Sequence, residues 1–304
     1  MKKQFNPVVF SAFDGISCGH VALERAGIIV KSYMASELLK INGKDNPSVL
    51  ITQHNYPETI QLGDICKIDG RSLRGIVQIV FGGSPCQSFS NAGTRDGFDG
   101  KSGLFWEFVR LINEIQPEYF LLENVVMKKE WQRIISDALG VEPIFINSSV
   151  ISGQNRPRLY WTNIPYTPIE DNGILLSDVI LGAITGASKH GKLNPDYGII
   201  PGEKKWKNIG WEFNPNNKSR CLVRSTGHYA NIQGKVMKYI PEHCEALQTL
   251  NKGYTAVPGV SDTQRMKALG DAWTVDVLVN AFFKNLPWAT EMKDALSSFQ
   301  KYIK

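Results

Sequence analysis

The sequence predicts an α/β protein with a doubly wound, mostly parallel sheet and a second, smaller and loop-rich domain. Short apolar runs alternate with helical patterns over the first 165 residues. Glycine, asparagine, proline and lysine then accumulate up to about residue 240, and a helical pattern returns after residue 268. Alternating strands and helices imply a parallel sheet with helices on both of its faces.

Each expected strand is a short apolar run that ends at a glycine or at a polar residue. The four runs cover residues 8–13, 28–35, 76–81 and 119–122. A helix-compatible stretch covers residues 20–26, and apolar residues at helical spacing mark residues 104–115, until Pro117 ends the pattern. Ligands bind at the carboxyl ends of the strands in such sheets. The candidate site therefore consists of the residues that end or follow the strands: Asp14, Glu37, residues 82–86 and Glu123.

We divide the chain into three parts. Residues 1–165 are expected to form the first domain, and residues 166–240 the second, where the helical and strand periodicity fades. Residues 241–304 return to a regular pattern. Their apolar spacing predicts one helix over residues 268–283, which we expect to pack on the first domain.

The formal net charge of +5 is too small to identify a partner, but the charge is unevenly distributed. Residues 186–240 contain ten basic and three acidic side chains, so this segment carries +7 and the rest of the chain −2. Such a block indicates a surface that faces a polyanion. A lysine-rich surface that only contacts water is the alternative.

The composition disfavours membrane, secreted and metal-binding proteins. No apolar run approaches the length of a membrane span, and no signal-peptide core follows the basic N-terminal residues. The five cysteines are scattered and form no Cys-x-x-Cys pair, so we expect neither a disulfide framework nor a zinc cluster. An intracellular, reduced protein without a metal and without membrane association is expected.

The first candidate binding segment is Phe13-Asp14-Gly15-Ile16-Ser17-Cys18-Gly19, between an expected strand and helix. Glycine lets the backbone approach a ligand closely, and the start of a helix offers free N–H groups. Glu37 ends the second strand, where an acid can accept hydrogen bonds from ribose hydroxyls. Any α/β protein needs glycine turns, however, and an acid at this position can simply cap a helix.

Cys86 is the candidate nucleophile, in the segment Gly82-Gly83-Ser84-Pro85-Cys86-Gln87-Ser88-Phe89-Ser90. A structural cysteine normally sits inside an apolar element, whereas this one follows two glycines in a polar loop. A nucleophilic cysteine needs exposure and a lowered pKa. A buried or incidental thiol is the alternative.

Two further segments contain charged residues next to apolar strands. Glu123 ends a buried strand, where a carboxylate costs free energy unless it has partners or a task, and it is suited to hold or donate a proton. Arg156 and Arg158 alternate, so in an extended segment both point to one side and can face an anion or a base edge. Buried structural ion pairs are the alternative.

Taken in order, these segments resemble the cytosine-5 DNA methyltransferases over nearly the whole chain. The loop at residues 13–19 is similar to that family's cofactor loop, Glu37 to its ribose-binding acid, and Gly63-Asp64-Ile65 to the segment that holds adenine. Pro85-Cys86-Gln87 resembles the nucleophile motif, Glu123-Asn124-Val125 the proton-handling motif, and Gln154-x-Arg156-x-Arg158 the arginine motif. Three later segments also match: Lys218-Ser219-Arg220-Cys221-Leu222, residues 239–248 and Gly270-Asp271-Ala272-Trp273.

The resemblance implies a Rossmann-like, S-adenosylmethionine-dependent methyltransferase domain with a target-recognition domain. It implies that the enzyme methylates C5 of a flipped-out cytosine in double-stranded DNA, in the cytoplasm and at the nucleoid of a bacterial or phage-infected cell. The implied catalytic residues are Cys86, Glu123, Arg156 and Arg158. The implied cofactor contacts are Phe13, Asp14, Gly15, Ser17, Gly19, Glu37, Asp64, Ile65, Ser84, Pro85, Asp271 and Trp273. The implied DNA contacts are Gln87, Ser88, Ser90, Gln154, Arg220 and Arg224.

Some features separate the branches of the family. Phe-Asp-Gly-Ile in the cofactor loop and a short recognition region resemble the animal de novo branch, whereas Gln154 and Arg156 keep the bacterial form of the arginine motif. Asp271 stands where the family usually has asparagine, which puts its cofactor contact in doubt. Three alternatives remain: a transfer-RNA methyltransferase of the same fold, a DNA-binding paralogue without activity, and a nucleotide-binding oxidoreductase, which the glycine turn alone suggests.

Overall fold

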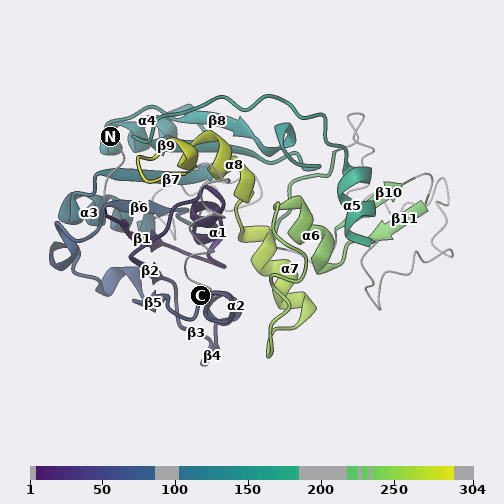
Figure 1. The fold of residues 1–304 in the computed structure, drawn as a ribbon, viewed down its shortest axis with the longest axis horizontal. Helices are drawn as coiled ribbons and strands as arrows, with labels where there is room; N and C mark the ends of the chain where they lie inside the picture. The colour runs from purple at the N-terminus through teal and green to yellow at the C-terminus, as the bar shows by residue number, and fades with distance from the viewer. Residues whose placement is uncertain (1–4, 86–102, 185–217, 225–227, 233–234, 291–304) are drawn as a thin grey trace. The chain divides into compact units, whose positions relative to one another are not determined.

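The computed structural model describes residues 5–85, 103–184, 218–224, 228–232 and 235–290 (Figure 1). It divides the chain into two compact units. The first unit consists of Met1–Ile146, Pro157–Ile169 and Val275–Lys304, and the second of Asn147–Arg156 and Glu170–Thr274. None of the helices in the described ranges is both long and apolar enough to cross a membrane.

The first unit is built around a seven-stranded sheet with the order β5-β2-β1-β6-β7-β9-β8 (Figure 1). The strands are β1 (Val8–Ala12), β2 (Ser32–Ser36), β5 (Ile60–Gln61), β6 (Ile79–Gly82), β7 (Tyr119–Val125), β8 (Ile144–Asn147) and β9 (Pro157–Thr162). All pairs from β5 to β7 are parallel, and β9 runs antiparallel to β7. This is the mostly parallel sheet that the sequence predicts.

Helices cover both faces of this sheet, which confirms the doubly wound arrangement. On one face, alternate strand residues such as Phe10, Val80 and Leu122 join a core cluster with Phe108 of α3 (Leu104–Ile115) and Ile135 of α4 (Lys129–Leu139). On the other face lie α1 (Cys18–Arg25) and α8 (Val275–Ala281), which pack together. The two layers follow from the period of two along each strand.

The remaining elements of the first unit are short. They are β3 (Lys40–Ile41), β4 (Lys44–Asp45), α2 (Pro47–Asn55) and the 3-10 helices η1 (Ile65–Lys67), η2 (Gly70–Leu73) and η7 (Phe283–Asn285). The side chain of Asn46 caps α2 by accepting a hydrogen bond from the amide of Ser48, and a proline occupies the first turn.

The second unit contains η5 (Ser148–Val150), α5 (Leu176–Ile184), α6 (Pro241–Leu247), α7 (Asp262–Asp271) and the hairpin of β10 (Tyr229–Ile232) and β11 (Lys235–Lys238). A network of ion pairs around the buried Arg265 ties α6 to α7. Arg265 contacts Glu242, Glu245 and Asp262, and the fully buried Glu245 also accepts hydrogen bonds from the amides of Gly253 and Thr255. These partners satisfy the carboxylate, as its burial requires.

Two of the expected strands begin later than the apolar runs suggest. β2 starts at Ser32 rather than at Ile28, because the amide of Ile28 bonds to the carbonyl of Leu23 and so closes the end of α1. β6 starts at Ile79, because the amide of Val77 is used in a turn with Leu73. Apolar runs do not show where turn hydrogen bonds replace sheet pairing.

The single helix predicted over residues 268–283 is wrong. The structure has α7 and α8, and between them Ala272 adopts an extended conformation (ψ 159°). The carbonyl of Ala272 accepts hydrogen bonds from the side chains of Gln248 and Arg156. These long-range donors replace helical partners, so tertiary contacts override the local helical pattern.

His20 of α1 makes the stability of the first unit depend on pH. Its ring stacks between those of Tyr33 and Tyr56, with centroids 4.3 and 3.9 Å away, and burial lowers the pKa of His20 to about 4. The unfolded chain therefore binds a proton at His20 near pH 6.5, and the folded chain only near pH 4. Stability falls as the pH falls through this window, because the unfolded state then binds more protons.

We expect His20→Phe to remove this dependence. Between pH 7 and pH 5 the wild-type chain should lose about 2 kcal/mol more of its free energy of unfolding than the variant does. Urea unfolding at both pH values measures the difference. His54→Gln, at an exposed histidine of α2, is the control and should keep the wild-type loss. Equal losses in wild type and His20→Phe would show that His20 is not responsible.

Candidate active site

The candidate site begins where the parallel strands end. The pairing register aligns Ser36, Ala12, Gly82 and Leu122 across β2, β1, β6 and β7. The next residues along these four strands are Glu37, Phe13, Gly83 and Glu123. The order of strands reverses at β1, between β2 and β6, and ligands bind at such a switch point.

The loop after β1 has a strained backbone held by hydrogen bonds. Phe13, Gly15 and Ser17 have positive φ angles of 54°, 61° and 58°, which is uncommon for residues other than glycine. The carboxylate of Asp14 accepts hydrogen bonds from the hydroxyls of Ser17 and Tyr33. Burial raises the pKa of Asp14. Strain of this kind is found preferentially at functional sites.

Glu37 lies beside this loop. Its Oε2 accepts a hydrogen bond from the amide of Gly15 at 3.0 Å, and Oε1 accepts from Leu38 and from Asn46. Burial raises the pKa of Glu37. A helix-capping role is excluded, because Asn46 caps the following helix α2. Nothing lies within 4 Å of the position of a Cβ on Gly15, so the backbone is open to a ligand there.

The segment Gly63-Asp64-Ile65 adjoins the same strand end, since the hydroxyl of Ser36 donates to the carbonyl of Gly63. Asp64 caps η1 by accepting from the amide of Cys66, and Ile65 is buried in the core. Leu38 directly follows Glu37 and is 51% exposed, so an apolar side chain lies at the surface beside the candidate site.

Gly19, which the resemblance implies as a cofactor contact, is a packing residue in the structure. It is buried in α1, and a Cβ there would lie 2.3 Å from the ring of Phe81. Gly19 therefore permits close packing of α1 on β6, and the structure shows no open backbone at this residue. Gly82 is similarly constrained, because a Cβ would lie 2.7 Å from the carbonyl of Ala12.

The loop after β6 is anchored to β7. The side-chain amide of Asn124 donates to the hydroxyl of Ser84 at 3.0 Å, and both residues are buried. Asn124 directly follows Glu123, so this bond ties Ser84 to the strand that contains the predicted proton-handling residue. Cys86, Gln87, Ser88 and Ser90 lie outside the described residues.

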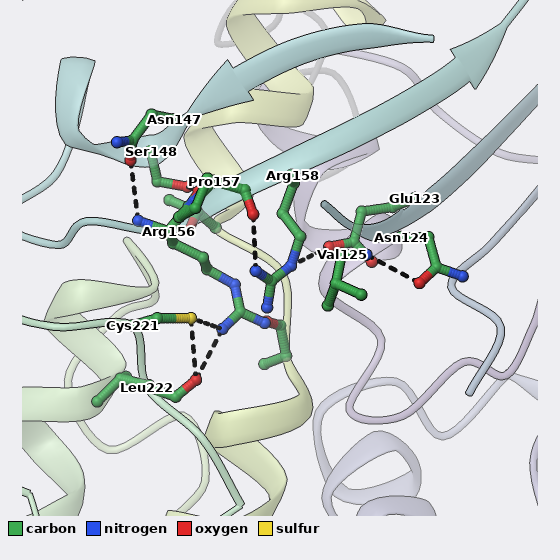
Figure 2. Close-up of polar contacts among 12 residues, drawn as sticks. Glu123, Asn124, Val125, Asn147, Ser148, Arg156, Pro157, Arg158, Cys221 and Leu222 are labelled. Atoms are coloured by element: carbon green, nitrogen blue, oxygen red, sulfur yellow. Dashed lines mark hydrogen bonds and ion pairs between the residues drawn. The ribbon is translucent and has the colours of Figure 1, made fainter. Parts of the chain in front are cut away.

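Glu123 and Arg158 form a buried ion pair (Figure 2). Nε of Arg158 lies 2.7 Å from Oε1 of Glu123, and the two side chains are 12% and 10% exposed. The pair follows from the register of β7 and β9. Glu123 is opposite Tyr160, and Arg158, two residues away on β9, shares its face of the sheet. The structure thus brings together two of the four predicted catalytic residues.

Arg156 does not share these contacts (Figure 2). Its guanidinium, which is almost fully buried, donates to the carbonyls of Leu222 at 2.9 Å and Ala272 at 2.7 Å, and also reaches Gly270. All these partners belong to the second unit. The guanidinium of Arg156 therefore joins backbone segments of the second unit, whereas Arg158 pairs with Glu123, and the catalytic role of Arg156 stays a prediction.

Replacing Arg156 should therefore lower the stability of the second unit. We expect Arg156→Met to lower the free energy of unfolding by about 3 kcal/mol, because several buried carbonyls lose their donor. Chemical denaturation measures this loss. Arg133→Met, at a largely exposed arginine, is the control and should change stability by less than about 0.5 kcal/mol. A stable but inactive Arg156→Met would instead support a direct catalytic role.

Among the predicted DNA contacts, Gln154 is fully buried. Its amide donates to the carbonyl of Leu247, and its oxygen accepts from the amide of Leu222. Gln154 therefore holds the second unit together and is not available to read a base. Lys218 is likewise buried and donates to the carbonyls of Ser149 and Ser152, so one member of the basic block is structural.

The other predicted contacts of the second unit lie at its surface. Arg220 is exposed, and Trp273, which follows α7 in the sequence, is partly buried. Arg224 forms an ion pair with Asp271 at 2.6 Å, and both side chains are more than half exposed. A predicted DNA contact and a predicted cofactor contact are thus paired with each other.

Residues 8–134 match the family model "C-5 cytosine-specific DNA methylase". This segment contains the loop after β1, Glu37, the Cys86 segment and Glu123. The first unit is thus similar to C-5 cytosine-specific DNA methylases over the part of the chain that contains the candidate site.

A phage protein and two solved structures illustrate the similarity. The orphan methyltransferase M.SPRI of Bacillus phage SPR is 34% identical over 164 residues, which is 50% of this chain and 36% of that protein. The chain thus matches little more than a third of that relative's length. The structure of Entamoeba histolytica methyltransferase EhMeth has a TM-score of 0.68 at 14% identity, over 91% of this chain and 97% of that one. A putative prophage-encoded DNA modification methyltransferase of E. coli has a TM-score of 0.63 at 18% identity, over 97% of this chain and 100% of that one. At these identities the structures support the Rossmann-like methyltransferase fold of the domain.

Proposed function

We propose that the protein transfers a methyl group from S-adenosylmethionine to C5 of a cytosine in double-stranded DNA, with Cys86 as the nucleophile. The observation that carries this proposal is the buried Glu123–Arg158 pair at the strand ends of the first unit. The bond between Ser84 and Asn124 adds support, because it ties the strand of Glu123 to the segment that contains Cys86.

The first step is the addition of the Cys86 thiolate to C6 of cytosine. C5 is a poor nucleophile, and this addition moves the electron pair of the C5–C6 double bond toward C5 and N3. The activated C5 then forms a bond to the methyl carbon, and the bond between that carbon and the donor sulfur breaks. A solvent base takes the C5 proton, and the electron pair restores the double bond and expels the thiolate.

Glu123 and Arg158 stabilise the charge that develops during the addition. Glu123, after it has taken up a proton from solvent, is suited to donate a hydrogen bond or that proton to N3, and the guanidinium of Arg158 to stabilise O2. Because the two side chains are paired and little exposed, they are held in fixed orientation before the base arrives. Preorganised charges in such a site act without reorganising during the reaction.

The residues around the loop after β1 fit S-adenosylmethionine, which supplies an electrophilic methyl group on a sulfonium. Glu37 presents a carboxylate to ribose hydroxyls, and the open backbone of Gly15 allows close approach. The apolar, half-exposed Leu38 next to Glu37 suits a purine ring. Phe13, Asp14, Ser17, Asp64, Ile65, Ser84 and Pro85 complete the proposed set.

The target cytosine is expected to leave the helix, because a stacked base cannot reach a nucleophile within the protein. The basic block of residues 186–240 would neutralise phosphates and position the duplex. The two arginines of this block, Arg220 and Arg224, are both exposed on the second unit.

Methyl transfer from labelled S-adenosylmethionine tests the proposal. We expect label in duplex DNA, at C5 of cytosine, and none in transfer RNA. Sequencing of methylated cytosines in cells that express the chain then gives the target sequence. Label in transfer RNA alone would support the alternative substrate, and no label in either nucleic acid would reject the proposed activity.

A further inference from the structure

Arg224, which the proposed function places in contact with DNA, forms an ion pair with the carboxylate of Asp271. Nη1 of Arg224 lies 2.6 Å from Oδ2 of Asp271, and the side chains are 57% and 52% exposed. Both residues belong to the second unit. Arg224 also belongs to the basic block of residues 186–240, in which acids are few.

The surrounding backbone holds the two residues next to each other. A Cβ on Gly270 would lie 2.3 Å from the carbonyl of Val223 and 2.6 Å from the amide of Arg224, so these two segments are in direct contact. The buried guanidinium of Arg156 bonds to the carbonyls of Leu222 and Ala272, one on each segment. The Arg224–Asp271 pair is therefore built into the fold and is not a chance meeting of two flexible side chains.

The same pair is weak enough to be exchanged. Exposed ion pairs contribute at most about 1 kcal/mol, since water and salt screen both charges. A phosphate accepts hydrogen bonds from a guanidinium in the same paired geometry as a carboxylate does. Arg224 can thus leave Asp271 for a phosphate at small cost, and Asp271 then remains as a negative charge near the DNA backbone.

We propose that Asp271 is an internal counter-anion that competes with a DNA phosphate for Arg224 and thereby limits the affinity of the protein for duplex DNA. The inference rests on the proposed function, because it requires that the second unit binds DNA. Phosphate contacts carry no sequence information. A competing carboxylate therefore weakens sequence-independent binding, so that base contacts supply a larger share of the total affinity.

The variant Asp271→Asn tests this inference by removing the charge and keeping the shape. We expect it to bind duplex DNA about two- to fivefold more tightly than the wild type at moderate salt. A plot of log K against log salt should become steeper by up to about one, because Arg224 no longer exchanges one anion for another. In the background Arg224→Gln, the same substitution should have no effect on affinity.

Asp69→Asn is the matched control. Asp69 forms an exposed ion pair with Arg71 in the first unit at 2.8 Å, so this variant breaks a similar pair and changes the net charge equally. We expect its DNA affinity to equal that of the wild type. The affinity for S-adenosylmethionine and the Tm of Asp271→Asn are measured in parallel, so that a change in cofactor binding or in stability is separated from a change in DNA affinity.

The outcomes separate the two hypotheses. If the wild-type chain has no affinity for duplex DNA, the proposed function fails and this inference fails with it. If the wild type binds DNA but Asp271→Asn has the same affinity and salt dependence, only the inference is overturned. A loss of S-adenosylmethionine affinity without a change in DNA binding also overturns it, in favour of a cofactor contact. An equal gain in Asp69→Asn would show that net charge alone is responsible.

Discussion

Replacing Cys86 with alanine should reduce methyl transfer by about 10⁴-fold or more and leave binding of duplex DNA unchanged. The reason is that without a thiolate no adduct forms at C6, and C5 stays too electron-poor to accept the methyl group. When the nucleophile of a covalent mechanism is removed, only the rate enhancement that comes from binding and from the charged groups remains. Methyl incorporation and DNA affinity, measured on the same preparations, check both parts of the prediction.

A trapping experiment tests the covalent step itself. DNA that carries 5-fluorocytosine at the target has no C5 proton to lose, so the enzyme should remain bound to it when the methyl donor is present. Cys66→Ala, at an exposed cysteine of the first unit, is the control and should give wild-type activity and wild-type trapping. Trapping by Cys86→Ala, or residual turnover near the wild-type rate, would assign the nucleophile to another residue.

The fold could be predicted from the sequence because its main signals are local. The strand–helix alternation, the glycines at the end of β6 and the end of α3 near Pro117 all depend on neighbouring residues. The break between α7 and α8 could not be predicted in this way. It depends on Arg156 and Gln248, which bond to Ala272 from 116 and 24 residues away in the sequence.

The same difference between local and long-range signals explains which residues of the candidate site could be predicted. Glu37 and Glu123 were found because each occurs at the end of an apolar run, which places both at one edge of a parallel sheet. The different contacts of Arg156 and Arg158 could not be predicted, because the two arginines alternate in the sequence and look equivalent there. Only the tertiary contacts with Glu123 on one side, and with Leu222 and Ala272 on the other, separate them. The burial of Gln154 could not be predicted for the same reason, because its side chain bonds to the backbone of Leu222 and Leu247, which are far away in the sequence.

Glu123→Gln is the second substitution from which we expect a large effect, a decrease of about 10²- to 10⁴-fold in the rate of methyl transfer. Glutamine keeps the shape of the side chain and can still hydrogen-bond to N3, but it cannot transfer a proton there. The Cys86 adduct then carries more negative charge in the ring, so its formation becomes slower. Single-turnover methyl transfer measures the chemical step without product release, and trapping on 5-fluorocytosine DNA should slow by a similar factor.

The loss of the ion pair needs its own control, because Glu123→Gln leaves Arg158 with a weakened partner in a little-exposed position. The double variant Glu123→Gln with Arg158→Gln removes both charges. If the two residues act as a unit on the base, the double variant should be little slower than the slower single variant, whereas independent roles would multiply the two losses. Glu130→Gln, at an exposed acid of α4, changes the net charge equally and should keep full activity. Full activity in Glu123→Gln itself would remove the proton-handling role, and the ion pair would then serve only to join β7 to β9.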